Sequence, residues 1–200
     1  MKEHNRASEW FDSMYSQNRE SQEQIPWARQ AVNPLLQSYL DDNHQHDGRA
    51  LVIGCGLGDD AKALEEAGYT VTAIDVSQTA LDLAKERFVG STISFEKQDI
   101  FDYKEQYNFV FEAFTIQSLP IKFREKMIKS VANTVVKGGR ILLVAHKREA
   151  MFEGPPWPLE KNEVDLFKEE GLKEISFELH QEASKISNIR FRVLYENPLL

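Results

Sequence analysis

The chain has 200 residues, 42% of them hydrophobic and 28% charged, which suits one globular domain with a substantial core. Its formal net charge of −8 disfavours a main role on nucleic acid, because an acidic surface repels phosphate backbones. The sequence shows neither a bilayer-spanning apolar run of about 18 residues nor a signal-peptide core, and its one cysteine is Cys55. We therefore expect a cytoplasmic monomer or homodimer with no membrane partner.

The first 45 residues are expected to form a helical cap, and residues 46–200 an α/β core, within a single domain covering 1–200. Two helices are predicted in the cap, over residues 8–15 and 28–40, joined by a polar loop. We expect these helices to lie across the mouth of the fold.

The core alternates short apolar runs with longer amphipathic ones, the pattern of strands and crossover helices in a parallel sheet. Strands are predicted at 50–53, 71–74, 92–95, around 109–111 and at 141–145. Helices are predicted at 59–67, from a cap at Ser77 to Phe88, and at 121–136, closed by Gly138 and Gly139. The last of these strands is continuously apolar, as expected for a strand buried on both faces.

The C-terminal part begins with a stiff proline-rich segment, 154–158, which fits neither a regular helix nor a central strand. A helix predicted at 161–170 ends before Gly171. The segments 174–179 and 189–195 alternate in polarity like an antiparallel pair at the sheet edge. The predicted fold class is α/β, a Rossmann-like doubly wound sheet of seven mostly parallel strands.

A glycine-rich loop follows the first strand and indicates a nucleoside-binding site. Gly54, Gly56 and Gly58 occupy alternate positions after a buried strand, where glycine lets the backbone turn sharply and approach a ligand. Asp75 ends the second strand, where a carboxylate can accept both hydroxyls of a ribose. A lone glycine turn is weak evidence, but the strand before it, the helix after it and the spaced Asp75 together favour a cofactor.

The charges beside this loop favour a cationic cofactor over a dinucleotide. A dinucleotide-binding loop has glycine at the position of Asp59, and Asp60 follows it. Two carboxylates at a helix N-terminus would repel a pyrophosphate but not a ligand that bears an ammonium and a sulfonium. A nicotinamide-dependent oxidoreductase is therefore the weaker alternative.

These motifs resemble the class I S-adenosylmethionine-dependent methyltransferases over roughly residues 49–145. Residues 53–58 are similar to the family's first motif, 73–77 to the second, 98–101 to the third and 136–142 to the turn into the fifth strand. The resemblance implies S-adenosylmethionine as cofactor, S-adenosylhomocysteine as product, the strand order 3-2-1-4-5-7-6 with strand 7 antiparallel, and N-terminal helices over the cofactor site. The cofactor-binding residues that it implies are Gly54, Cys55, Gly56, Gly58, Asp75, Val76, Ser77, Asp99, Ile100 and Glu112. The chain departs from the family pattern at Asn108, often an aspartate, and at Lys137, where the turn commonly carries a proline.

The segments flanking the core resemble those of small-molecule methyltransferases of the thiopurine and tellurite-resistance type. They are residues 9–15, Pro26-Trp27 and 154–159. The resemblance implies an aromatic acceptor pocket, for which the candidate residues are Trp10, Tyr15, Trp27 and Trp157. Their rings would pack against a flat acceptor and contact the sulfonium by cation–π attraction. Simple packing on the domain is the competing interpretation for each.

The segment after the fourth strand, 112–120, is expected beside the transferred methyl, with Thr115 and Gln117 as candidates to orient the acceptor. It lacks the Asn-Pro-Pro-aromatic motif of enzymes that methylate exocyclic amines. The catalytic residues stay unknown; the candidates are His146, which follows the fifth strand and could act as a general base, and Tyr15. A sulfonium is already a good leaving group, so alignment in a dry pocket can suffice.

The leading hypothesis is methyl transfer from S-adenosylmethionine to a small thiol, amine, hydroxyl or chalcogen acceptor. A cofactor-binding module without catalysis is the alternative from a different class. We expect no metal, because the polar cluster of His44, His46 and Asp47 has no second ligand group and suits a solvated loop.

Overall fold

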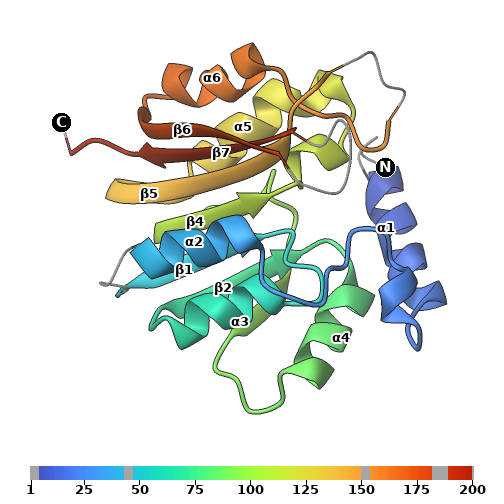
Figure 1. Cartoon of the computed structure of the whole chain (residues 1–200). Coiled ribbons are helices and arrows are strands. Elements are labelled where there is room, and N and C mark those ends of the chain that lie inside the picture. The colour runs from blue at the N-terminus through green and yellow to red at the C-terminus, as the bar shows by residue number, and fades with distance from the viewer. Residues whose placement is uncertain (1–4, 43–46, 150–153, 182–188, 200) are drawn as a thin grey trace. The chain divides into compact units, whose positions relative to one another are not determined.

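The computed structural model describes residues 5–42, 47–149, 154–181 and 189–199, and these form a seven-stranded sheet with helices (Figure 1). The strand order is β3-β2-β1-β4-β5-β7-β6, and β7 is antiparallel to both β5 and β6. This confirms the predicted fold class and topology. The strands are β1 Arg49–Ile53, β2 Thr70–Asp75, β3 Ser94–Lys97, β4 Tyr107–Ala113, β5 Val135–His146, β6 Lys173–Gln181 and β7 Ile189–Glu196.

The described residues fall into two compact units, within 1–99 and 100–200. In the first unit, β1, β2 and β3 pair in parallel, as predicted for a βαβ arrangement. Its helices are α1 Asn5–Gln17, the short 3₁₀ turn η1 Gln22–Gln24, α2 Pro34–Asp42, α3 Asp59–Glu66 and α4 Gln78–Arg87. Helix α3 packs on β1 and β2, α4 packs on β2 and β3, and α1 lies beside α4 (Figure 1).

The second predicted helix of the cap begins six residues later than expected, at Pro34 rather than Ala28. Proline suits the first turn of a helix and disfavours helical backbone in the residue before it. Asn33 completes the cap, because its side-chain Oδ1 accepts a hydrogen bond from the Leu35 amide at 3.0 Å. The predicted 28–40 helix was therefore wrong at its start, and residues 28–33 form an irregular connection with bends at 30 and 31.

The second unit contains β4 to β7, the 3₁₀ turns η2 Ile116–Ser118 and η3 Ile121–Phe123, and the helices α5 Arg124–Ala132 and α6 Lys161–Glu169. Strand β5 pairs in parallel with β4 and antiparallel with β7. Over the described ranges, no helix combines the length and apolar character needed to cross a membrane.

The predicted 121–136 helix was wrong at both ends: α5 covers 124–132, and β5 already begins at Val135. Val135 and Val136 are β-branched and favour a strand. The glycine pair lies inside β5 rather than after a helix. The Gly138 amide donates to the Asn197 carbonyl at 2.7 Å, and a Cβ on Gly139 would lie 2.9 Å from the Asn108 carbonyl oxygen. The glycines therefore permit close backbone contacts within the sheet. Strand β3 is also shifted from the predicted 92–95 to 94–97, in register with Thr72–Asp75.

Gly58 is a position in the first unit where an added side chain would be overpacked. Its φ is +85°, and an added Cβ would lie 3.1 Å from the Ala84 Cβ and 3.2 Å from the Phe95 ring. Gly58 thus lets α3 start directly against α4 and β3. The close packing that a dinucleotide loop assigns to its third glycine is provided here by this residue.

We predict that Gly58→Ala lowers the free energy of unfolding by about 3 kcal/mol, the sum of left-handed backbone strain and overpacking. Gly90→Ala is the matched control, because Gly90 has a φ of +86° and nothing within 4 Å of its added Cβ. It should cost only the backbone strain, about 1 kcal/mol. Equal losses in urea unfolding would show that the contacts with Ala84 and Phe95 do not matter.

Candidate active site

The glycine loop has the backbone conformation that the sequence predicts. Gly54, Gly56 and Gly58 all have positive φ, at 64°, 51° and 85°. The Cys55 amide donates to the Ile74 carbonyl at 3.0 Å, which ties the loop to the end of β2. Cys55 itself is buried, and burial raises the pKa of its thiol, so it suits a packing role in the turn rather than a nucleophile.

Asp75 is the anchor of this loop. Its Oδ2 accepts the Gly56 amide at 2.9 Å, and its Oδ1 accepts the Ser77 amide at 2.9 Å. Burial raises the pKa of Asp75, and hydrogen bonds from the Ser77, Gly56 and Val76 amides oppose this effect. A carboxylate can accept about four hydrogen bonds, so Asp75 keeps acceptor capacity beyond these amides. It is therefore positioned to accept a further hydrogen bond, as a ribose hydroxyl would supply.

The remaining predicted cofactor residues of the first unit border Asp75. Val76 is half-buried, and Ser77 is fully buried as the cap of α4, where its hydroxyl accepts the Ala80 amide at 3.0 Å. The Gln98 amide donates to the Asp75 carbonyl at 3.0 Å, which places Asp99, half-buried, beside the end of β2.

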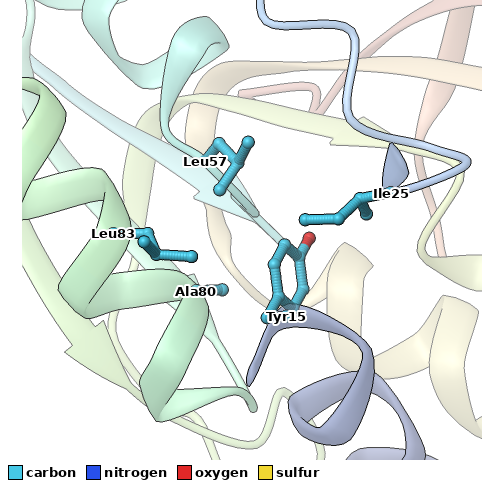
Figure 2. Close-up of a cluster of buried hydrophobic side chains, with 5 residues drawn as sticks. All are labelled: Tyr15, Ile25, Leu57, Ala80 and Leu83. Carbon is cyan, nitrogen blue, oxygen red and sulfur yellow. The ribbon is translucent and has the colours of Figure 1, made fainter. Parts of the chain in front are cut away.

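Tyr15 of α1 covers the glycine loop. Its hydroxyl oxygen lies 2.8 Å from where a Cβ on Gly56 would be, so an alanine there would clash with it. The Trp27 indole donates to this hydroxyl at 2.8 Å, which leaves the hydroxyl its own proton to donate. Figure 2 shows the ring of Tyr15 among Ile25, Leu57 and α4. Burial and the charge of Asp75 raise the pKa of Tyr15, so it is a hydrogen-bond donor and a poor general base at neutral pH.

The aromatic residues at the N-terminus gather around Trp27. Trp10 and Phe11 lie with their ring centroids 5.4 and 5.3 Å from that of Trp27, and the Tyr15 centroid is 5.9 Å away. Trp10 is 44% exposed, whereas Tyr15 is 3% exposed. The structure therefore joins Trp10, Tyr15 and Trp27 in one cluster next to the glycine loop.

The two carboxylates after the glycine loop are not free charges. Asp59 forms a bidentate ion pair with Arg87, at 2.7 Å for both bonds, and Arg87 also donates to the Leu57 carbonyl. Asp60 accepts the Asn33 amide at 2.7 Å, and burial raises its pKa to about 6. The repulsion that the sequence predicts for a pyrophosphate is thus weaker than two free carboxylates would give. Arg87 is the residue that sequence reasoning missed.

Glu112 is a buried acidic side chain of the second unit with one oxygen left without a hydrogen-bond partner among the described residues. Its side chain is fully buried at the end of β4, and its Oε1 accepts the amides of Thr115 and Ile116 at 2.7 and 2.9 Å. Its Oε2 is buried and has no hydrogen-bond partner among the described residues. Burial raises the pKa of Glu112 to about 7, although both amide bonds favour the carboxylate. Ile100, the other cofactor candidate of this unit, is buried at 6% exposure.

The acceptor candidates of the second unit hold one another in place. The Gln117 side-chain Oε1 accepts the His146 amide at 2.8 Å, and its carbonyl accepts the Trp157 amide at 2.7 Å. The His146 ring stacks on Phe114, with centroids 4.9 Å apart. Thr115 is half-buried in the turn that Glu112 caps. Gln117 therefore positions its neighbours, whereas Trp157 and His146 are partly exposed.

Arg124 fixes this arrangement and was not predicted. Its guanidinium donates to the Ile116 carbonyl at 2.7 Å, to the Trp157 carbonyl at 2.8 Å and to Glu163 at 3.0 Å, and it is 3% exposed. One signal in the sequence is its place in the first turn of α5, where the helix dipole disfavours a cation. Such a residue needs acceptors from elsewhere in the fold.

Among the described residues, no cluster of three or more His, Cys, Asp or Glu side chains could hold a metal ion. His44 and His46, two members of the polar cluster named in the sequence analysis, lie outside the described residues.

Comparison with known proteins agrees with this geometry. The family model described as thiopurine S-methyltransferase matches residues 12–187. Thiocyanate methyltransferase 1 of Arabidopsis thaliana is 28% identical over 167 residues, covering 78% of this chain and 72% of its own. Thiopurine S-methyltransferase of Vibrio parahaemolyticus is 27% identical and covers 80% of each chain. The crystal structure of magnesium protoporphyrin IX methyltransferase from Synechocystis with bound S-adenosylhomocysteine shares the fold, with a TM-score of 0.73, 14% identity, and 94% and 98% coverage.

The buried carboxyl of Glu112 predicts a pH dependence of stability. Because its pKa in the folded protein, about 7, exceeds the ordinary 4.5, its favourable protonated state is lost as the pH rises through 7. Relative to Glu112→Gln, the wild type should lose roughly 3 kcal/mol of unfolding free energy between about pH 4 and pH 8. Urea unfolding at several pH values measures this. Glu125→Gln, at an exposed site on α5, should show no such change, and a pH-independent difference for Glu112→Gln would refute the prediction.

Proposed function

Since the chain belongs to the thiopurine S-methyltransferase family, we propose that the acceptor of its methyl transfer is sulfur in a small thiol or thiocyanate-like nucleophile. The chain is an S-adenosylmethionine-dependent methyltransferase that acts on a small molecule. The sequence alone leaves thiols, amines, hydroxyls and chalcogens open as acceptors. Our proposal selects sulfur from this set. The names of the thiocyanate, thiol and thiopurine methyltransferases that it resembles support this choice.

The observation that carries the proposal is the burial of two candidate acid–base groups, Tyr15 and Glu112. Burial raises the pKa of Tyr15, so its hydroxyl stays protonated at neutral pH. Glu112 is fully buried, and its Oε1 accepts the Thr115 and Ile116 amides, so this carboxyl is engaged in the turn after β4. A hydroxyl acceptor needs a base to remove its proton, whereas a thiol ionises near pH 8.5 and thiocyanate is already an anion. The site therefore suits a nucleophile that arrives ionised. His146, stacked on Phe114, stays a weak candidate for a base.

The first unit fits the cofactor. Asp75 keeps acceptor capacity for a ribose hydroxyl beyond its backbone amides, and a Cβ on Gly56 would lie 2.8 Å from the Tyr15 hydroxyl oxygen. We assign cofactor contacts there to Gly54, Cys55, Gly56, Gly58, Asp75, Val76, Ser77 and Asp99. Ile100 and Glu112 of the second unit are further proposed contacts. When bound, the cofactor supplies an activated methyl on a sulfonium, and the chain's residues bind it, orient it and exclude water.

Acceptor contacts are proposed at Trp10, Tyr15, Trp27, Thr115 and Trp157, with Gln117 holding Trp157 through its carbonyl. Tyr15 contributes a hydroxyl proton, because its oxygen already accepts from Trp27. A cofactor-binding module without catalysis is not favoured by the family, and neither is a nicotinamide-dependent oxidoreductase. A cytoplasmic location, a monomeric or homodimeric state and the lack of a nucleic acid partner are retained as proposals.

We predict that matched aromatic acceptors separate by the transferred atom. At pH 7.5, thiophenol should be methylated about 100-fold faster than phenol or aniline, because only the thiol is substantially ionised. Release of S-adenosylhomocysteine, followed for the three acceptors and for thiocyanate, measures this. Phenol or aniline turning over as fast as thiophenol would contradict a sulfur acceptor, while leaving the methyltransferase activity intact.

A further inference from the structure

Asp12 joins α1 to the start of α4. Its Oδ1 accepts the Ser77 hydroxyl at 2.7 Å and the Thr79 amide at 3.0 Å. A carboxylate at a helix N-terminus is also favoured by the helix dipole. Burial opposes ionisation of Asp12, but the bonds from Ser77 and Thr79 outweigh it and lower its pKa. The contact is therefore a charged and directional link between two helices that are distant in sequence.

The partner of Asp12 is also a neighbour of the proposed ribose-binding carboxylate. The Ser77 amide donates to Asp75, while the Ser77 hydroxyl accepts the Ala80 amide and donates to Asp12. All polar groups of Ser77 at this end of α4 are thus committed. If Asp12 is displaced, the Ser77 hydroxyl loses its acceptor and keeps only the bond from the Ala80 amide. Ser77 is then held less firmly, and its amide is one of the donors that position Asp75.

Asp12 and Tyr15 lie three residues apart and so share one face of α1. Asp12 binds the N-terminus of α4, and Tyr15 lies over Gly56 and packs against Leu57, Ala80 and Leu83 (Figure 2). One face of one helix therefore contacts both sides of the Asp75 anchor, the Ser77 side and the Gly56 side. Docking of α1 through Asp12 determines where the Tyr15 hydroxyl is placed.

We propose that Asp12 is a positioning residue for the cofactor: by docking α1 on α4 it orders both Ser77 and Tyr15 around Asp75, so that docking of α1 and cofactor binding reinforce each other. This inference rests on the proposed function, in that Asp75 binds the cofactor. Asp12 acts through Ser77 and Tyr15 and does not itself touch the reacting atoms. Coupling of this kind is reciprocal, so a bound cofactor also stabilises α1 on α4.

A second contact between the α1 and α4 segments, an exposed ion pair, provides an internal control. Arg19, after α1, pairs with Glu86 in the last turn of α4, and their side chains are 44% and 59% exposed. Exposed ion pairs contribute little, and this one contacts neither Asp75 nor the glycine loop. Removing the Arg19–Glu86 pair tests whether any weakening of the contact between α1 and α4 affects the cofactor, without disturbing Ser77.

The test compares Asp12→Ala, Asp12→Asn and Arg19→Ala with the wild type. Calorimetric titration with S-adenosylhomocysteine gives Kd, and steady-state kinetics with a thiol acceptor gives kcat and both KM values. Asp12→Ala should raise Kd and the KM for S-adenosylmethionine about tenfold, with kcat within about twofold. The acceptor KM should rise less than the KM for S-adenosylmethionine, because only Tyr15 among the proposed acceptor contacts depends on Asp12. Asp12→Asn retains the oxygen acceptor and should restore most of the affinity. Arg19→Ala should stay within about twofold of the wild type.

An unchanged Kd in Asp12→Ala, or an equal rise in Arg19→Ala, would overturn the inference. Hydrogen exchange of the wild type serves if Asp12→Ala does not fold: bound S-adenosylhomocysteine should slow exchange of the α1 amides at least about tenfold. Exchange unaffected by the ligand would overturn the coupling. A wild type that binds no S-adenosylhomocysteine would instead overturn the proposed function, and this inference with it.

Discussion

The first unit depends on one interaction, the hydrogen bonds that backbone amides donate to the Asp75 carboxylate. The Gly56 and Ser77 amides come from the turns after β1 and β2, so the carboxylate joins the ends of two neighbouring strands. Burial of a carboxylate is costly unless it is hydrogen-bonded, which explains why both oxygens are occupied. Because a carboxylate can accept about four hydrogen bonds, the same group that holds the loops together can also bind a ribose hydroxyl. Structure and cofactor recognition therefore share a residue, and Asp12 and Tyr15 are arranged around it.

In the second unit, too, buried charged side chains hold turns through backbone groups, here one acid and one base. Glu112 gives one oxygen to the turn at Thr115 and Ile116, and Arg124 gives its guanidinium to carbonyls of Ile116 and Trp157. Both groups are buried, and each ties the segment after β4 to its surroundings. Burial raises the pKa of Glu112 to about 7, so charge on this carboxyl is less favourable than on an exposed glutamate. A sulfur nucleophile that arrives ionised does not depend on this buried carboxyl as a base.

Much of the fold follows from local signals, and the exceptions have local causes. The strands and the places of the glycine loop and Asp75 at strand ends were predicted correctly because strand periodicity and glycine spacing are properties of short segments. The strand order, which the structure confirms, was implied by the resemblance to the class I methyltransferases. The start of α2 was misjudged because the effect of Pro34 and Asn33 was overlooked, and the α5–β5 boundary because the strand preference of Val135 was overlooked. Asp12, Arg87 and Arg124 could not be singled out, since their partners are up to tens of residues distant in sequence. The charge argument at Asp59 is weakened for that same reason, because its partner Arg87 lies 28 residues away in sequence.

Asp75 is expected to anchor a sulfonium nucleoside rather than a dinucleotide. Calorimetric titration with S-adenosylhomocysteine and with NAD, on the wild type, Asp75→Ala and the exposed control Asp41→Ala, tests it most directly. We predict that the wild type and Asp41→Ala bind S-adenosylhomocysteine, that Asp75→Ala loses at least about 100-fold in affinity, and that none of them binds NAD. Binding of NAD by the wild type, or undiminished binding of S-adenosylhomocysteine by Asp75→Ala, would contradict the account.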